Sequence, residues 1–226
     1  MGPQAPKERL SHLLELATQG PQMRATLAGE LADLLLDWPS DFPETMRAPV
    51  VALLEKTVRE TDDGTRAKLA ARLGGHGELP LDLVNEFYLL APARVRREIL
   101  MRNELVDGEA GDTAAPDAAL LVAVARDAKV RDFTERFGYA FGIAPCTAQT
   151  ILSDSSGEAL AVLCKGAHLD RAAFSALALL KGVHADDTTA QLAAFDTVPQ
   201  HAAERLTRTW LIHRAPPKHA RTEAAE

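Results

Sequence analysis

Hydrophobic residues recur every three or four positions along most of this chain, which is the spacing that places them on one face of an α-helix. The first such stripe ends at Gly20-Pro21, and a later one ends at the glycine-rich segment 74–77. The pattern predicts helices over residues 7–19, 22–37, 46–61, 65–73, 80–90, 92–105, 118–128, 130–141, 145–152, 158–165, 170–180, 188–195 and 199–214.

Polar residues at several expected helix starts have the spacing of a capping box, in which a first side chain and another three positions later bond each other's backbone. We predict such boxes at Asp41 with Glu44, Ser155 with Glu158, and Thr188 with Gln191. Residues 62–64 (Asp-Asp-Gly) are expected to form a turn before the helix at 65–73.

A short internal repeat indicates how the first helices are arranged. Residues 24–31 (RATLAGEL) match residues 66–73 (RAKLAARL) at five of eight positions, with an offset of 42 residues. A period near 40 residues with two helices per unit is typical of HEAT and armadillo arrays, in which stacked pairs cover one another's apolar faces. Coincidence in a chain rich in Ala and Leu is the alternative.

The predicted fold class is therefore all-α, built from stacked antiparallel helix pairs. We expect a HEAT-like α-solenoid of helical repeats at 7–105 and a helical C-terminal domain at 117–214. Residues 106–116 (VDGEAGDTAAP) are the expected linker, because Gly, Asp and Pro interrupt helices. The polar, Pro-containing segment 215–226 is expected to be disordered.

Composition supports helices and argues against some classes of function. Only 5% of residues are aromatic, and the net charge is −7, with an acidic excess in both halves. Since nucleic-acid-binding domains usually carry a basic surface, we expect no nucleic-acid partner. The start of the chain lacks the apolar core of a signal peptide, and no apolar run approaches the ~20 residues that span a bilayer. A cytoplasmic location without membrane contact is the resulting expectation.

The residues offer little basis for catalysis. No pair of histidines has the i, i+4 spacing of a helical metal site, and neither a GxSxG motif nor a Walker-type phosphate loop occurs. His76 lies in a glycine-rich turn and is expected at the surface. Cys146 and Cys164 are expected to be buried, reduced thiols, although Cys164 beside an unplaced histidine could be a nucleophile. We predict no enzymatic activity, no metal and no cofactor.

Arg94, Arg97 and Arg102, in a segment that also contains Arg96, are the candidate partner-binding residues. Arginines on one helix can bind an acidic partner or a phosphate. The other interpretation is a solvated face that Glu98 and Glu104 partly neutralise.

Residues 133–152 have the sequence order of a helix-turn-helix, with Gly142 in the turn. A DNA-binding regulator of this kind would need Lys129 and Arg131 for phosphate contacts, because residues 145–152 contain no Lys or Arg. A packing hairpin is the preferred interpretation. A small-molecule sensor with a pocket between the two halves is a further alternative.

The chain also resembles a bacterial family known only as domain of unknown function 2336. The resemblance rests on the segments 24–35, 65–73, 89–105, 156–166 and 170–174, and covers about residues 8–182. It implies an all-helical, repeat-like fold and carries no established catalytic residues. The leading hypothesis is a non-enzymatic protein–protein interaction module, an adaptor or regulator in bacterial signalling, whose partner is another protein and whose oligomeric state is open.

Overall fold

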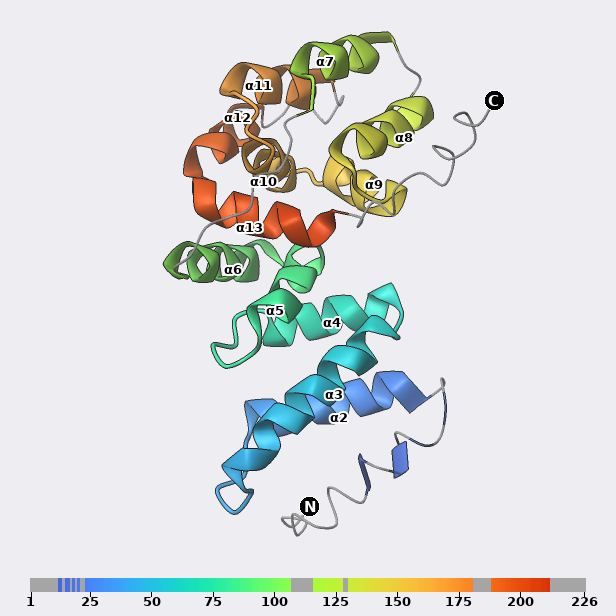
Figure 1. Ribbon diagram of the computed structural model, residues 1–226, viewed down its shortest axis with the longest axis vertical. Helices are drawn as coiled ribbons and strands as arrows, with labels where there is room; N and C mark the ends of the chain where they lie inside the picture. Colours follow the sequence, from blue (N-terminus) through green and yellow to red (C-terminus); the bar gives the residue numbers. More distant parts are fainter. Residues whose placement is uncertain are drawn as a thin grey trace, which may run out of the picture. The chain divides into compact units, whose positions relative to one another are not determined.

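The computed structural model describes residues 23–106, 116–127, 130–180 and 188–211, together with 12, 13, 15, 16, 18 and 20 (Figure 1). Every regular element in these ranges is helical, and an isolated antiparallel bridge joins Ile143 to Leu211. The predicted all-α class is confirmed. The expected disordered tail, 215–226, lies outside the described residues.

The chain divides into two compact units, Met1–Ile99 and Leu100–Glu226. The division falls within one helix, α6 (Ala93–Leu105), rather than in the predicted linker 106–116. Of that predicted linker, the structure describes only Val106 and Pro116.

Unit 1 contains the helices predicted from residue 22 onward, with small shifts at their ends. The predicted helix at 7–19 lies mostly outside the described residues. Its α-helices are α2 (Arg24–Leu36), α3 (Arg47–Arg59), α4 (Asp63–Leu73), α5 (Leu81–Phe87) and the first part of α6; its 3₁₀ turns are η2 (Glu44–Met46) and η3 (Tyr88–Leu90). The predicted helix at 80–90 is thus a short α-helix followed by a 3₁₀ turn. Pro80 is the N-cap of α5. The missing N–H of proline costs no hydrogen bond at this position, because an N–H there would have no acceptor within the helix.

The internal repeat has the same buried positions in both copies. Residues 24–31 lie in α2 and residues 66–73 in α4, and the two helices contact each other. The three repeat positions that are buried in each copy are Leu27, Ala28 and Leu31 of α2 and Leu69, Ala70 and Leu73 of α4. Equivalent positions of the two segments are therefore buried.

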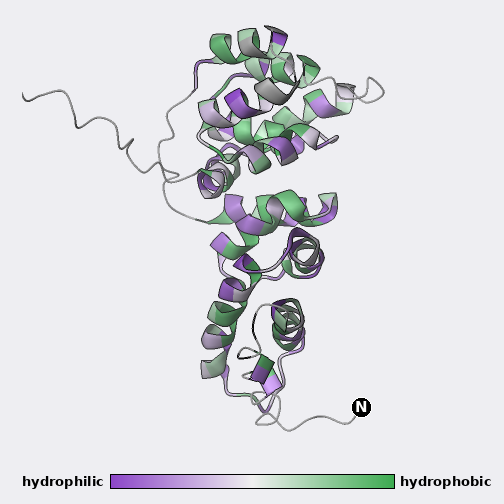
Figure 2. Cartoon of the chain, turned by 90° about the vertical axis from the view of Figure 1, so that its right-hand side faces the viewer, coloured by the Kyte–Doolittle hydropathy of each residue, from purple (hydrophilic) through white to green (hydrophobic). Residues whose placement is uncertain are grey.

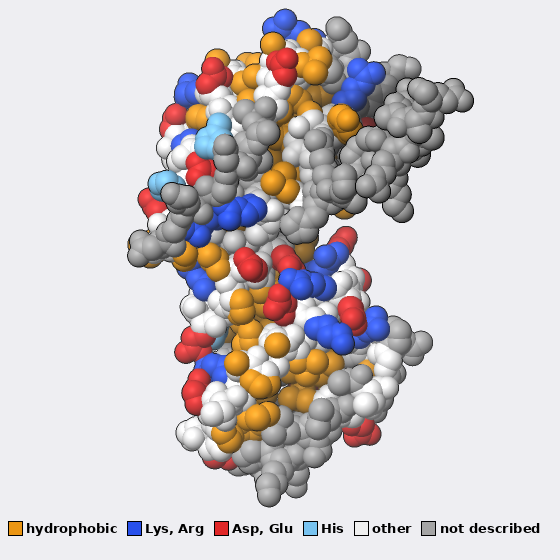
Figure 3. All heavy atoms as spheres, viewed as in Figure 1, with side chains coloured by type: hydrophobic (Ala, Val, Ile, Leu, Met, Phe, Trp, Pro, Cys, Tyr) orange, Lys and Arg blue, Asp and Glu red, His pale blue; other side chains and the backbone are white. Residues whose placement is uncertain are grey.

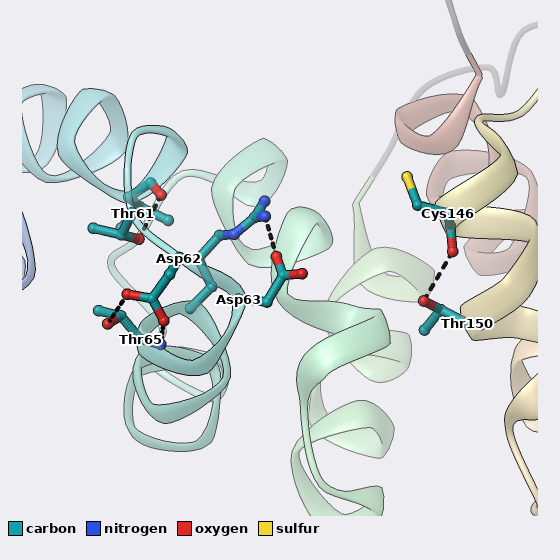
Figure 4. A network of polar contacts seen from close by, with 8 residues as sticks. Thr61, Asp62, Asp63, Thr65, Cys146 and Thr150 are labelled. Atoms are coloured by element: carbon teal, nitrogen blue, oxygen red, sulfur yellow. Dashed lines mark hydrogen bonds and ion pairs between the residues drawn. The ribbon is translucent and has the colours of Figure 1, made fainter.

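Helix α4 begins two residues before its predicted start because Asp62 caps it. The Asp62 carboxylate accepts hydrogen bonds from the Thr65 N–H at 2.9 Å and the Thr65 hydroxyl at 2.7 Å (Figure 4). These bonds satisfy a backbone donor that the first helical turn leaves open. The predicted turn at 62–64 is thus a cap plus the first helical residues.

Unit 2 contains seven α-helices among its described residues after α6. They are α7 (Ala118–Asp127), α8 (Val130–Phe141), α9 (Pro145–Ser153), α10 (Glu158–Gly166), α11 (Arg171–Leu180), α12 (Thr188–Thr197) and α13 (Gln200–Trp210). Helix α10 is the centre of this unit. It is buried along almost its whole length and contacts α9, α11, α12 and α13.

Two predicted capping boxes in unit 2 are replaced by other contacts. Asp154 Oδ2 accepts the Ala159 N–H of α10 at 3.0 Å, and Ser156 Oγ accepts the Glu158 N–H at 3.2 Å. Ser155 instead accepts a hydrogen bond at its carbonyl from the buried Gln191 side chain, at 2.8 Å. The bond from Gln191 joins the start of α10 to α12, so Gln191 does not serve a capping box with Thr188.

The predicted box at Asp41 and Glu44 is also absent. Glu44 begins the 3₁₀ turn η2, whose N-cap is Pro43, and no side chain caps that turn. A proline N-cap has no side-chain oxygen to offer, so the predicted reciprocal pair does not form here.

Candidate functional site

The three predicted binding arginines share helix α6. At 3.6 residues per turn, Arg97 and Arg102 point about 140° apart around the helix axis, and Arg94 lies between them. Arg94 is exposed and forms an ion pair with Glu98 one turn away. Arg97 is exposed, whereas Arg102 is half-buried, and burial lowers its pKa. The role of these three arginines in binding a partner stays a prediction.

The predicted helix-turn-helix order is present at residues 133–152. Helix α8 is followed by Gly142 with φ of +70°, a conformation that favours glycine, and then by α9. Helix α9 presents no Lys or Arg side chain. Lys129 and the side chain of Arg131 lie outside the described residues, so their predicted role in DNA binding stays a prediction.

The two cysteines differ in exposure, and the prediction that both are buried is wrong for Cys146. Cys146 is exposed on the first turn of α9, where its carbonyl accepts the Thr150 hydroxyl at 3.0 Å (Figure 4). Cys164 is fully buried in α10, and burial raises the pKa of its thiol. At neutral pH Cys164 therefore stays protonated, which makes it a poor nucleophile.

Unit 1 has an open polar hollow of about 360 Å³ near the end of α2. Its lining includes Trp38, Arg47, Glu78 and the half-buried His76. The Arg47 guanidinium lies 4.8 Å from the centre of the Trp38 ring and pairs with both Glu44 and Glu78. Because these carboxylates already neutralise the one arginine, the hollow has no spare positive charge for an anionic ligand.

Unit 2 has a polar cluster around the buried carboxylate of Glu204. Gln200 Nε2 donates to Glu204 Oε1 at 2.7 Å, and the Nδ1 atoms of His168 and His201 lie 3.9 Å and 3.7 Å from its two oxygens. Both imidazole distances exceed a hydrogen bond. No group of three or more metal-ligating side chains comes together in the described part of the chain. The cluster therefore provides a buried carboxylate with two imidazoles near it.

Helix α7 has the composition of a buried helix but is only partly buried. Residues 118–125 are eight consecutive hydrophobic residues, AALLVAVA. A helix that is hydrophobic on all sides is normally enclosed. Among the described α7 side chains, however, only Leu121 is buried, and Leu120 is 60% exposed. Helix α7, at the top of Figure 2, is coloured mainly as hydrophobic, and hydrophobic side chains reach the surface over it in Figure 3.

A groove of about 480 Å³ runs between α7 and α8. Its lining is almost wholly apolar, from Leu120 and Leu121 on one side and Tyr139 and Ala140 on the other. Tyr139 is 80% exposed. Single exposed apolar residues are common on proteins, but a groove that gathers two of them beside an apolar helix is a candidate binding surface.

A second hollow, of about 410 Å³, lies on the other side of α7 against α11. Alanines from both helices form most of its lining, with Val122 at its base. Some of the alanines that line this hollow are exposed, and they come from both helices. One alanine of α11 in the lining is half-buried. The apolar surface therefore extends across α7 from α8 to α11, and we call it the α7 face.

Charged residues are part of the lining on both sides of α7. Glu135 and Arg136 line the groove on the α8 side, and Arg126 and Asp170 line the hollow on the α11 side. The side chains of Glu135 and Arg136 form no ion pair with each other or with any other described residue. Each side thus carries one acidic and one basic residue.

The sequence contains a signal for this face that periodicity did not identify. The run of eight hydrophobic residues at 118–125 exceeds what a one-sided amphipathic helix needs. A helix of this kind needs burial on all sides, so an exposed one indicates a missing neighbour. The pattern alone, however, cannot say which side remains uncovered.

Comparison with known families confirms the predicted resemblance. Residues 112–208 match the family model described as an uncharacterised protein conserved in bacteria (DUF2336). The match includes the segments 156–166 and 170–174 but none of the three segments before residue 106. It therefore begins much later in the chain than the predicted range 8–182. No curated protein and no solved structure matches the chain.

Proposed function

We propose that this DUF2336-containing chain is a non-enzymatic protein-binding module that acts as an adaptor or regulator in bacterial signalling. The observation that carries the proposal is the α7 face. It is an apolar surface on a helix whose hydrophobic residues favour packing against other elements on every side. A cytoplasmic location is part of the proposal. None of the described helices is long and apolar enough to cross a membrane.

The shape and chemistry of the α7 face favour a protein over a small ligand. Small-molecule sites enclose most of their ligand and combine apolar walls with a few aimed polar groups. The groove between α7 and α8 is open, and its charged lining residues are Glu135 and Arg136. An apolar surface that includes a tyrosine and has charged residues beside it is typical of protein interfaces.

The repeat in unit 1 supports a role as a scaffold for binding. Helices α2 and α4 bury equivalent residues, which favours stacked antiparallel helix pairs of the HEAT type in this unit. Stacked pairs present extended surfaces that bind partner helices or loops. We propose this arrangement for the N-terminal half.

The test is affinity capture of the tagged full-length chain from its native lysate, with and without nuclease, comparing three forms. Leu120→Glu places a charge in the α7 face. Met101→Glu is the matched control, because Met101 is 62% exposed on α6 and Leu120 is 60% exposed on α7. We expect the wild type and Met101→Glu to capture the same proteins in equal amounts. Leu120→Glu should recover at least tenfold less of these proteins.

Two outcomes would contradict the proposal. Capture that Leu120→Glu leaves unchanged would remove the α7 face as the binding surface. Recovery that vanishes with nuclease would replace the proposal with the DNA-binding alternative.

A further inference from the structure

We propose that the α7 face binds a second copy of the same chain, so that two molecules join about a two-fold axis through their α7 helices. This inference rests on the proposed function, because it names the occupant of the same surface. In a two-fold interface one patch meets itself, so the patch must be complementary to its own rotated copy. The α7 face meets that requirement in both charge and shape.

The charge pattern is self-complementary. Glu135 and Arg136 are adjacent on α8 and line the groove on one side of α7, and Arg126 and Asp170 line the hollow on the other side. Rotation by 180° can therefore set an acidic residue of one copy against a basic residue of the other on either side of α7. A different protein whose surface carries mainly one sign of charge would be attracted to one residue of each pair and repelled by the other.

The shape also provides both a projection and a recess. Leu120 and Tyr139 are 60% and 80% exposed and stand beside a groove of about 480 Å³. In a two-fold pair, Leu120 of each copy can enter the groove of the other, between Leu121 and Tyr139. Both grooves are then filled at once, which is what allows the interface to close at two copies.

The area that a stable interface requires calls for a face formed by several helices. A stable interface covers about 800 Å² on each partner, which one ten-residue helix about 15 Å long does not supply. The α7 face continues onto α8 through Tyr139 and Ala140 and onto α11 through Ala172 and Ala176. The association is expected to persist in about 0.5 M salt, where screening weakens charge pairs but leaves apolar burial intact.

The experiment is sedimentation velocity of the full-length chain at about 1 to 100 μM. These concentrations cover the typical dissociation constants of weak dimers. The wild type and Met101→Glu should shift from monomer to dimer over one shared concentration range. Leu120→Glu should raise the dimer dissociation constant at least tenfold. Circular dichroism and thermal melting of each variant establish that it is folded, so that loss of dimer is not loss of structure.

A charge exchange gives a second, independent readout. Glu135→Arg places like charges at one edge of the pair and should weaken the dimer. Adding Arg136→Glu restores an acidic and a basic residue in exchanged positions and should recover much of the loss. Recovery by the double variant indicates that the two residues face each other across a two-fold axis.

The results separate failure of this inference from failure of the proposed function. The wild type could remain monomeric at 100 μM while Leu120→Glu still abolishes capture of other proteins. That result would overturn the proposal of a second copy and leave the proposed binding module intact. A dimer that Leu120→Glu does not weaken overturns the assignment of the α7 face to it. A monomer whose captured proteins do not depend on Leu120 overturns both.

Discussion

At the scale of single residues, close packing between α10 and α13 depends on one missing side chain. A Cβ atom added to Gly166 would lie 2.6 Å from the Ala203 carbonyl oxygen and would also collide with Thr207 of α13. Thr207 is buried and donates a 3.3 Å hydrogen bond to the Val162 carbonyl. Because backbone as well as side-chain atoms block the added carbon, the helices must separate to accommodate it.

We therefore expect Gly166→Ala to lower the free energy of unfolding by about 1–3 kcal/mol, the usual cost of overpacking a core. Gly29→Ala in α2 is the matched control, because an added Cβ there meets nothing within 4 Å. That change should raise stability by about 0.5–1 kcal/mol, since alanine restricts the unfolded chain more than glycine does. Urea denaturation measures both, and equal stabilisation by the two alanines would refute the close packing at Gly166.

The two thiols should differ in reactivity as they differ in burial. Cys146 is exposed, whereas Cys164 is fully buried with a raised thiol pKa. A thiol reagent at neutral pH should modify one cysteine per native chain and both of the two cysteines after unfolding. Mass spectrometry of the labelled peptides identifies the site. Rapid modification of Cys164 in the native chain would contradict its burial.

At the scale of helices, periodicity predicted where helices occur but not which polar residue caps them. The expected capping boxes at Ser155 and Thr188 follow a spacing rule, yet Asp154 caps α10 and Gln191 bonds the Ser155 carbonyl instead. Spacing cannot rank neighbouring acceptors, because the choice depends on tertiary contacts such as the one between α10 and α12. The turn at Asp62 could be located from the sequence, since an Asp before a helical stripe is a frequent N-cap.

The Asp62 cap should make the stability of the chain depend on pH. Hydrogen bonds from the Thr65 hydroxyl and N–H lower the pKa of Asp62 in the folded state. A group with a lowered folded pKa stabilises the fold above its unfolded pKa, near 4, and loses that contribution as pH falls through the folded value. The melting temperature of the wild type should therefore exceed that of Asp62→Asn at neutral pH, with the difference narrowing below about pH 4.

Thermal melts followed by circular dichroism at several pH values check this expectation. Asp41→Asn is the control, because the exposed Asp41 side chain bonds no other described residue. A difference between the wild type and Asp62→Asn that stays constant from pH 7 to pH 3 would show that the charge on Asp62 does not matter.

At the scale of the whole molecule, the sequence was sufficient for the fold class but not for the α7 face. The hydrophobic pattern predicted the helices, and the repeat at 24–31 and 66–73 buries equivalent residues in α2 and α4. The candidate arginines of α6 were chosen by local charge density, and their role in binding stays a prediction. The α7 face depends on which side of an apolar helix its own unit leaves uncovered, and only tertiary structure determines that.

The most direct test of protein binding at the α7 face is photo-crosslinking in the native cells. A photoreactive phenylalanine analogue replaces Leu120 in one form of the chain and Met101 in a control form. We predict a crosslinked protein product from position 120 and far less from position 101, with the α7–α8 segment of a second copy as the crosslinked peptide. Crosslinks of equal yield from the two positions, or none from position 120, would contradict the assignment of this face to protein binding.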